Sequence, residues 1–427
     1  MRNPTRPVRS AFALLACIAA SASAVDIPYW GRFILDSTGE AAGPSKLKFD
    51  KNDKLKIAFR GHYDIQYVEY GGGGLKKEIA DTGTGGEAKL DFDLDAQGDP
   101  HIAYFDAGYT KVYYAKRQGG KWAHAVLPKI HKENYNVDWY QLAMAVDPKG
   151  GAHISYAREV DNFPAQWHAY VDKDGALSDS GFVLPELSGK WNSMALDKDG
   201  KPVIAYFRHE AEDLMVSWME GAAWKHQVVG QGTATPPHGF HCAIARQNDS
   251  AYRLIWQERT PLKHELWTAL GKPGGAWETE KITDLPGYTV FASQNALAIG
   301  PDGRPYVAFG RHRSTDNVTV TDGDLMLAYR EAGEWKQLVV DTVGITGLYA
   351  ALAVDSKGMP AISYYEASKR TMKMALGSLT PVAVRRGMTI KRPASAKPGP
   401  RLDATGREDA VSGGAERPQG KVLFGRP

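Results

Sequence analysis

The chain has 427 residues, 43% of them hydrophobic, and a formal net charge of +3. This length can bury a large core, and the composition is typical of a globular protein rather than a disordered or membrane-embedded one. The positive charge lies at the ends, because residues 1–24 contain three arginines and residues 380–427 carry ten Lys and Arg against four Asp and Glu. Residues 25–379 therefore have a net charge of −6, which argues against a general nucleic-acid-binding body, and we expect no nucleic-acid partner.

Residues 1–24 have the pattern of a secretory signal peptide. Arginines come first, an apolar run starts at Ala11, and small residues end at Ala24. We expect cleavage after Ala24 and export to the periplasm or the extracellular space, and no transmembrane segment, because the run is too short for a mature anchor. The alternative is a lipoprotein anchored through Cys17, although Leu15 is atypical for that motif. After cleavage Cys242 is the one remaining cysteine, so we expect a small buried thiol and no internal disulfide.

A unit of about four short strands recurs along residues 25–379. Its second-strand apolar residue recurs every 45 to 55 residues, at Ile57, Ile102, Ile154, Ile204, Leu254, Val307 and Ile362. Seven units of this period predict an all-β fold, a single seven-bladed β-propeller. Turns such as Asp197–Pro202 precede the second strands. They suit hairpins, because Asp caps the turn and Gly accepts a positive φ, and they lack the later ligands of a calcium loop.

The first strand of each unit alternates small and large residues, as in Ala143–Val146, which suits an innermost strand near the axis. The first two units differ, with Lys46 and Lys48 in one and Asp91 and Asp93 in the other. Because these positions are equivalent on adjacent blades, we expect ion pairs between the blades.

The outer strand is marked by tryptophan in four units, but the seventh unit ends near Leu379 without one. The missing strand lies at the other end of the chain, where Tyr29–Asp36 resembles Trp335–Asp341. We therefore expect an N-terminal strand to complete the last blade and close the ring, which removes open sheet edges. Residues 380–427 are rich in Pro, Gly and Ala and show no periodicity, so we expect a disordered, solvated tail.

Charged residues recur where the second strands end, on the face that also carries the loops linking successive blades. In each unit an aromatic residue ends the second strand, and the residue two positions later is charged in six of the seven units. The seven residues at this position are Gly61, Asp106, Arg158, Arg208, Glu258, Arg311 and Glu366. Arginines suit carboxylate or sulfate, and aromatic residues on linking loops suit sugar rings. The interpretation is a funnel around the axis that binds a glycan or another anionic small molecule. Its expected ligand-binding residues are Asp106, Arg158, Arg208, His209, Glu258, Arg311, His312, Glu366, Trp191 and His241.

Other interpretations of the same residues remain open. Strand ends are often polar, and these charges can simply pair with each other. A lyase would need a cation such as Arg208 or Arg311, a base such as His209 or His312, and an acid such as Tyr349 or Tyr140. A hydrolase would need two carboxylates, for which Asp106, Glu210, Glu258 and Glu366 are candidates.

The sequence offers no convincing metal or cofactor motif. His238 and His241 stand beside Cys242, but residues three apart on a strand face opposite ways, so we expect no metal. Residues 71–74 are all glycine but lack the Lys-Ser/Thr of a phosphate loop, and we expect no cofactor.

The repeat in residues 193–224 and 296–335, L-A-x-D-x-x-G-x-P-x-I-A-Y followed by a later Trp, resembles secreted bacterial propellers of the sialidase-like/BNR type. The resemblance covers nearly all of residues 26–379 and implies the propeller fold. The group includes sialidases, seven-bladed polysaccharide lyases and glycan-binding propellers. The S-x-D-x-G-x-T-W Asp box of true sialidases is absent. We expect an exported, monomeric glycan- or anion-binding propeller; the alternatives are an extracellular lyase or glycosidase and a protein-interaction scaffold.

Overall fold

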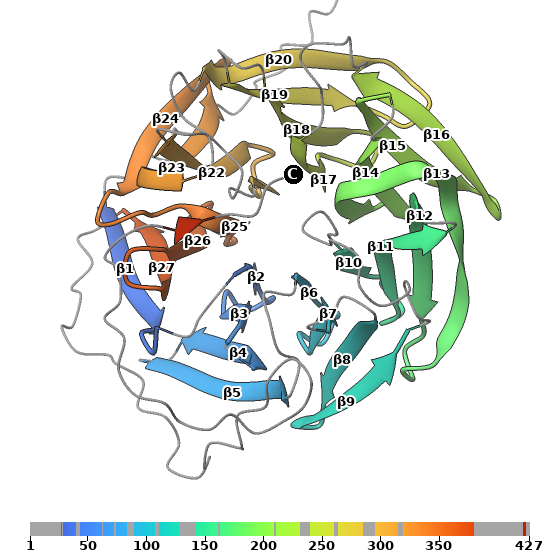
Figure 1. The fold of residues 1–427 in the computed structure, drawn as a ribbon, viewed down its shortest axis with the longest axis horizontal. Helices are drawn as coiled ribbons and strands as arrows, with labels where there is room; N and C mark the ends of the chain where they lie inside the picture. Colours follow the sequence, from blue (N-terminus) through green and yellow to red (C-terminus); the bar gives the residue numbers. More distant parts are fainter. Residues whose placement is uncertain are drawn as a thin grey trace, which may run out of the picture.

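The computed structural model describes residues 27, 29–39, 43–61, 63–71, 74–82, 89–106, 111–127, 142–160, 163–208, 211–230, 240–259, 264–284, 295–314, 319–379 and 422–423. Within these ranges the regular structure is entirely β-strand. The strands form seven four-stranded antiparallel blades arranged as a ring, each running outward from an inner strand near the axis (Figure 1). The predicted seven-bladed propeller is therefore confirmed.

The blades follow one another along the chain. Blade 1 contains β2 (Ser45–Phe49), β3 (Leu55–Arg60), β4 (Asp64–Gly71) and β5 (Gly74–Thr82). Blade 2 contains β6 (Leu90–Leu94), β7 (Pro100–Phe105), β8 (Val112–Gln118) and β9 (Lys121–Val126). Blade 3 contains β10 (Leu142–Val146), β11 (Ala152–Val160), β12 (Phe163–Val171) and the first half of β13 (Leu177–Leu196). The second half of β13 is the inner strand of blade 4, which continues through β14 (Pro202–Arg208), β15 (Asp213–Glu220) and β16 (Ala223–Gly230).

Three further blades complete the ring. Blade 5 contains β17 (Phe240–Arg246), β18 (Tyr252–Arg259), β19 (His264–Gly271) and β20 (Trp277–Asp284). Blade 6 contains β21 (Ala296–Ile299), β22 (Pro305–Ser314), β23 (Thr319–Glu331) and β24 (Glu334–Asp341). Blade 7 contains β25 (Leu348–Val354), β26 (Pro360–Glu366), β27 (Thr371–Ser378) and, as its outer strand, β1 (Tyr29–Asp36).

The N-terminal strand closes the ring. β1 pairs antiparallel with β27, so that Trp30 lies opposite Gly377 and Phe33 opposite Met374. The resemblance between Tyr29–Asp36 and Trp335–Asp341 thus corresponds to structural equivalence, because β24 is the outer strand of blade 6. The predicted closure by the N-terminal strand is confirmed.

The core lies between the facing sheets of neighbouring blades. Second strands are buried throughout, as in β3, β7 and β26. Between blades 1 and 2, for example, Ile65 and Tyr67 pack in one cluster with Phe92 and Ile102. This burial explains why the second-strand apolar residue gave the clearest repeat: it contacts protein on both sides.

The inner strands of blades 1 and 2 carry the expected ion pairs. Lys46 Nζ lies 3.4 Å from Asp91 Oδ1, and Lys48 Nζ lies 3.1 Å from Asp93 Oδ1. The second oxygen of each aspartate accepts a backbone N–H of blade 3, Met144 N at 2.8 Å and Val146 N at 3.0 Å. The carboxylates therefore also satisfy donors on the free inner edge of the next sheet.

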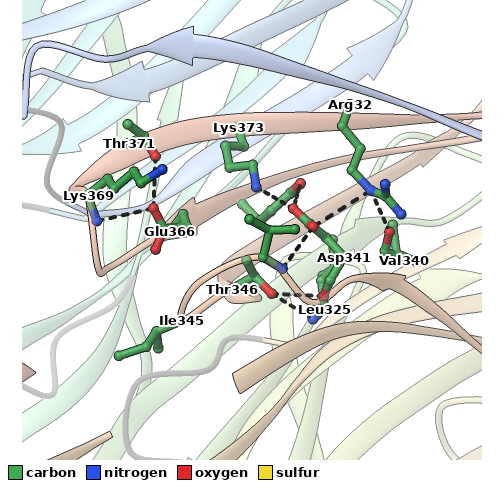
Figure 2. A network of polar contacts seen from close by, with 12 residues as sticks. Arg32, Leu325, Val340, Asp341, Ile345, Thr346, Glu366, Lys369, Thr371 and Lys373 are labelled. Carbon is green, nitrogen blue, oxygen red and sulfur yellow. Dashed lines mark hydrogen bonds and ion pairs between the residues drawn. The ribbon is translucent and has the colours of Figure 1, made fainter. Parts of the chain in front are cut away.

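An aspartate at the end of an outer strand ties each of three blades to the next. Asp341 of β24 accepts hydrogen bonds from Tyr364 OH (2.6 Å) and Lys373 Nζ of blade 7 (Figure 2). Asp36 of β1 accepts Lys77 Nζ of blade 1 at 2.6 Å, and Asp81 of β5 accepts the hydroxyl of Tyr104 in blade 2.

Residues 1–24 and most of the tail lie outside the described residues, so the leader and the disordered tail stay predictions. The exception is β28 (Val422–Leu423), which pairs with Thr319–Val320 of β23. In the part of the chain that the structure describes, no helix is long and apolar enough to cross a bilayer.

Candidate functional site

The two faces of the ring differ in what they carry. Second strands end, and inner strands begin, on one face, which we call the linker face. The opposite face, the turn face, carries the tight turns between first and second strands, such as the turn in which Gly200 N donates to Asp197 O at 3.1 Å. Functional residues were expected on the linker face.

A cavity of about 40 Å³ lies at the start of the inner strands, on the axis of the linker face. Residues from six blades line this axial cavity; they include Lys46, Lys89, Asp91, Asn192, His241 and Asn295. Two lysines face one aspartate, so the charged lining carries a surplus of positive charge. Of the predicted binding residues, the structure places His241 in this lining.

Three bulky residues, which we call the entrance residues, adopt left-handed backbone conformations: His241 lines the cavity, Trp191 precedes the lining residue Asn192, and Tyr349 lies against the lining residue Lys89. Trp191, His241 and Tyr349 have φ angles of 49°, 50° and 51°. Each lies at a register irregularity, at the equivalent position of blades 4, 5 and 7. Such a conformation costs roughly 1–2 kcal/mol per residue for side chains of this size. The same costly bulge occurs three times around one opening. This repetition indicates that the bulge serves to orient these side chains.

Neighbouring blades hold two of these bulges in place. The Sγ–H of Cys242 in blade 5 donates to the Trp191 carbonyl at 2.8 Å, and Asn295 Nδ2 in blade 6 donates to the His241 carbonyl at 3.3 Å. Cys242 is 6% exposed, and burial raises the pKa of its thiol. Its expected character as a small buried group is confirmed.

Aromatic side chains pack beside lining residues of the cavity. Trp191 packs against Phe240 and Phe207 with ring centroids 4.5 and 5.2 Å apart, and both Trp191 and Phe240 are partly exposed. Lys89 Nζ lies 4.9 Å from the centre of the partly exposed Tyr349 ring. The entrance therefore combines aromatic faces with an ammonium group.

The three predicted arginines lie on the outgoing second strands, and each has a partner within its own blade. Arg208 forms an ion pair with Asp213, and Arg311 Nη2 lies 2.6 Å from Asp324 Oδ2. Each of these pairs joins residues directly opposite in the register, which is how cross-strand pairs stabilise a hairpin. The guanidinium of Arg158 lies 4.3 Å from the centre of the Trp167 ring.

The predicted carboxylates also bond within their own blades. Asp106 Oδ1 accepts Lys111 N at 3.0 Å, and Glu258 Oε1 accepts Trp256 Nε1 at 3.3 Å. Glu366 is 2% exposed and accepts Ser368 N at 2.8 Å. These residues, like the arginines, do not line the axial cavity.

His312 is buried, at 1% exposure. Its Nε2–H donates to the Thr346 carbonyl at 2.8 Å, and burial lowers the pKa of the imidazole to about 4. A neutral, enclosed ring of this kind cannot reach a ligand. His209, Glu210, Tyr140 and His238 fall outside the described residues. Among the described residues, no group of three or more His, Cys, Asp or Glu side chains could hold a metal ion.

Lys89 and Lys46 line the cavity but do not belong to the pattern of charged residues at the ends of the second strands. Lys89 stands thirteen residues before the aligned Ile102, and Trp191, His241 and Tyr349 stand thirteen before Ile204, Leu254 and Ile362. Reading this second position across the repeat would have identified the ring of entrance residues.

A larger cavity of about 460 Å³ opens on the turn face. Three of its aspartates, Asp95, Asp147 and Asp197, accept hydrogen bonds in their own turns; Asp147 Oδ1, for example, accepts Lys149 N at 2.8 Å and Gly151 N at 3.0 Å. Lys48 pairs with Asp93 between blades 1 and 2 at 3.1 Å, and Lys198 pairs with its neighbour Asp199 at 2.7 Å. We therefore place the candidate site on the linker face.

A scan of the sequence against protein-family models and a search of curated proteins each found no match. Solved structures do match. A streptogramin B lyase is 13% identical, with a TM-score of 0.52 over 82% of this chain and 98% of that chain. A fungal alcohol oxidase in complex with copper is 11% identical, with a TM-score of 0.54 over 83% of this chain and 76% of that chain.

An intramolecular trans-sialidase from Ruminococcus gnavus is 10% identical, with a TM-score of 0.46 over 81% of this chain and 96% of that chain. At these identities the likenesses concern the fold alone. The propeller fold that the resemblance of the repeat implies is confirmed: the chain is a seven-bladed β-propeller.

Proposed function

We propose that the protein binds a small anionic ligand, or an acidic group of a glycan, at the axial cavity of the linker face. One observation carries the proposal: Lys46 and Lys89 come together in a single cavity whose entrance bears Trp191, His241 and Tyr349 in strained conformations. Ammonium groups favour carboxylate and sulfate, and flat aromatic faces favour sugar rings.

The size of the cavity restricts what enters it. Sites that enclose whole small molecules have volumes of about 300–1,000 Å³, whereas a water molecule occupies about 30 Å³. A cavity of about 40 Å³ therefore suits one carboxylate or sulfate group. The remainder of the ligand would lie against Trp191 and Tyr349 at the entrance.

Replacing Lys89 by methionine should weaken binding of an acidic oligosaccharide about ten- to a hundredfold, because a charge-assisted hydrogen bond contributes about 1.5–3 kcal/mol. The probe is trigalacturonate, titrated by calorimetry, with uncharged trigalactose in parallel. Lys149→Met, on the turn face, is the matched control and should bind like the wild type. Binding should also weaken with rising salt.

The same titrations separate the competing interpretations. Equal affinity of Lys89→Met and the wild type would exclude the axial cavity. A loss of binding in Arg208→Ala and Arg311→Ala instead would favour the wider funnel. Appearance of unsaturated uronate absorbance or new reducing ends during incubation would identify a lyase or a hydrolase. Wild-type protein that binds neither trigalacturonate nor a sulfated glycan on an array would contradict the proposal as a whole.

We also propose that the protein is exported and that residues 1–24 are removed. The support is the run of arginines, apolar residues and small residues that ends at Ala24. N-terminal sequencing of protein from the periplasm or culture fluid should read Val25 first. A product that begins at a lipid-modified Cys17 would favour the anchored alternative, and intact Met1 would contradict cleavage.

A further inference from the structure

The segment that leads to Tyr349 is held from both sides. Residues 342–347 connect β24 of blade 6 to β25 of blade 7, and Tyr349 is the second residue of β25. This connecting segment passes between the ends of β22 and β26, which carry His312 and Glu366. Both residues were candidates for direct ligand contact, yet both are buried, at 1% and 2% exposure.

On the side of blade 6, His312 and Thr346 lock the segment to the β22–β23 hairpin. His312 donates to the Thr346 carbonyl at 2.8 Å, and Thr346 N donates to Gly323 O at 3.0 Å. Thr346 Oγ1 accepts Leu325 N at 3.1 Å, a contact drawn in Figure 2. The His312 ring fills a slot between two glycines: a Cβ on Gly310 or Gly323 would lie 2.0 or 2.2 Å from ring carbons.

On the side of blade 7, Glu366 and its neighbours hold the same segment. Glu366 Oε1 accepts Ser368 N at 2.8 Å, and Oε2 accepts Lys369 N at 3.1 Å (Figure 2). The turn after Glu366, which these hydrogen bonds stabilise, also binds Ile345. Ile345 N donates to Ser368 Oγ at 3.0 Å, and Ala367 N donates to Ile345 O at 2.9 Å.

Two glycines allow the segment to pass this closely. Gly344 and Gly347 have φ angles of 88° and 87°, which other residues rarely adopt. A Cβ on Gly344 would lie 2.3 Å from Glu366 Oε1, and one on Gly347 would lie 3.0 Å from Asp324 O. The backbone is thus determined up to Leu348, which is completely buried, and Tyr349 follows in its left-handed bulge.

We infer that His312 and Glu366 are positioning residues that clamp residues 342–347 and so set the orientation of Tyr349 at the axial cavity. The inference rests on the proposed function, because it assigns a role to Tyr349 in binding. It gives Glu366, a recurrent strand-end residue, and His312, the neighbour of Arg311, a task without ligand contact: His312 acts through Thr346, and Glu366 acts through Ser368 and Ile345. Local strain at Tyr349 persists because this surrounding network over-determines it.

The test is a double-mutant cycle between His312 and Tyr349, with trigalacturonate titrated by calorimetry. His312→Ala should weaken binding about tenfold in the wild-type background and at most about twofold in the Tyr349→Ala background, since coupled residues are non-additive. His312→Gln should restore binding to within about threefold, because its amide can donate to the Thr346 carbonyl from a similar position. Ser368→Ala, a mild surface change, should show a smaller loss with the same dependence on Tyr349.

His101→Ala is the matched control, because His101 is fully buried near the other end of the equivalent strand in blade 2. It should lower the melting temperature and leave affinity unchanged. The inference is overturned if His312→Ala and Ser368→Ala each weaken binding as much in the Tyr349→Ala background as in the wild-type background. It is also overturned if these two variants lower the melting temperature without any loss of affinity.

A ligand-free measurement keeps the two proposals apart. Amide hydrogen exchange of residues 346–351, followed by mass spectrometry, should accelerate in His312→Ala and Ser368→Ala but not in His101→Ala. If wild-type protein fails to bind the probe while exchange changes as expected, the proposed function fails and the clamp stands. If exchange in this segment is unchanged, the clamp is refuted whatever the affinity.

Discussion

Replacing Asp341 by alanine should lower the free energy of unfolding by about 3–5 kcal/mol, the usual cost of removing one partner from a buried charge pair. The Asp341 side chain is completely buried, and it accepts hydrogen bonds from Lys373, Tyr364 and Val343 N. Burial opposes the charged form, but the hydrogen bonds from Lys373 and Tyr364 hold the pKa of Asp341 below its ordinary value. Without this carboxylate, the largely buried Lys373 ammonium would lose its counter-charge.

Asp341 also contributes to the closure of the ring, so its replacement should weaken the contact between the N-terminal strand and blade 6 as well. Arg32 of the N-terminal strand lies 3.7 Å from Asp341 and donates to the Val340 carbonyl at 2.9 Å (Figure 2). Urea unfolding followed by tryptophan fluorescence measures the change. Glu334→Ala, on the same strand, is the control: its pair with Lys336 is 2.8 Å long but exposed to solvent, so its removal should leave the unfolding curve nearly unchanged. Similar losses in the two variants would show that the Asp341 network carries no special weight.

Acid should unfold the protein between about pH 4 and pH 6.5, because three buried histidines and the largely buried His153 resist protonation. Burial lowers the pKa of His101, His153 and His312 to about 4 and that of His168 to about 3. The unfolded chain binds these protons near the ordinary pKa of 6.5, so stability rises with pH through this window and is lost as pH falls. Because a shift of one pKa unit corresponds to about 1.4 kcal/mol, several shifts in the same direction together become comparable to the whole stability of about 5–15 kcal/mol.

The pair His153 and His168 illustrates why these rings stay neutral. His153 Nδ1 and His168 Nε2 are 3.0 Å apart, so that one ring donates its N–H to the other. Burial is the main cause that lowers both pKa values, and a positive charge on His153 would lower the pKa of His168 further. Unfolding free energies measured by urea from pH 4 to 8 test the expectation. His312→Gln should reduce the slope of the unfolding free energy against pH by the amount that corresponds to about one bound proton. A flat profile above pH 4 would contradict the expectation.

Much of the fold was accessible from the sequence because the repeat is a local property. Ile102 and Ile204 mark second strands that are buried on both faces, so their apolar character follows from strand geometry alone. The pairing of Lys46 with Asp91 was also accessible, because equivalent positions on adjacent blades are necessarily near each other.

The candidate site was accessible only in part. Counting along the repeat identifies which residues end the second strands, but not that Arg208 faces Asp213 or that Arg311 faces Asp324 across a hairpin. These cross-strand partners come from the far side of loops of different length, so their distance is not a function of sequence spacing. The contact of Lys89 with Tyr349 is of the same kind: it joins blade 2 to blade 7 past the intervening blade 1, which sequence spacing does not predict.

By itself, the sequence determined the number of blades, the closing N-terminal strand and the face on which the inner strands begin, because each follows from a repeated local pattern. Only the tertiary structure decided which polar residues reach the axis. Closing seven blades into a ring brings Lys46, Lys89 and His241 to one cavity, while it buries His312 and Glu366 against a linking segment. The reason is geometric: burial and convergence depend on how separate blades meet, and no single repeat contains that information.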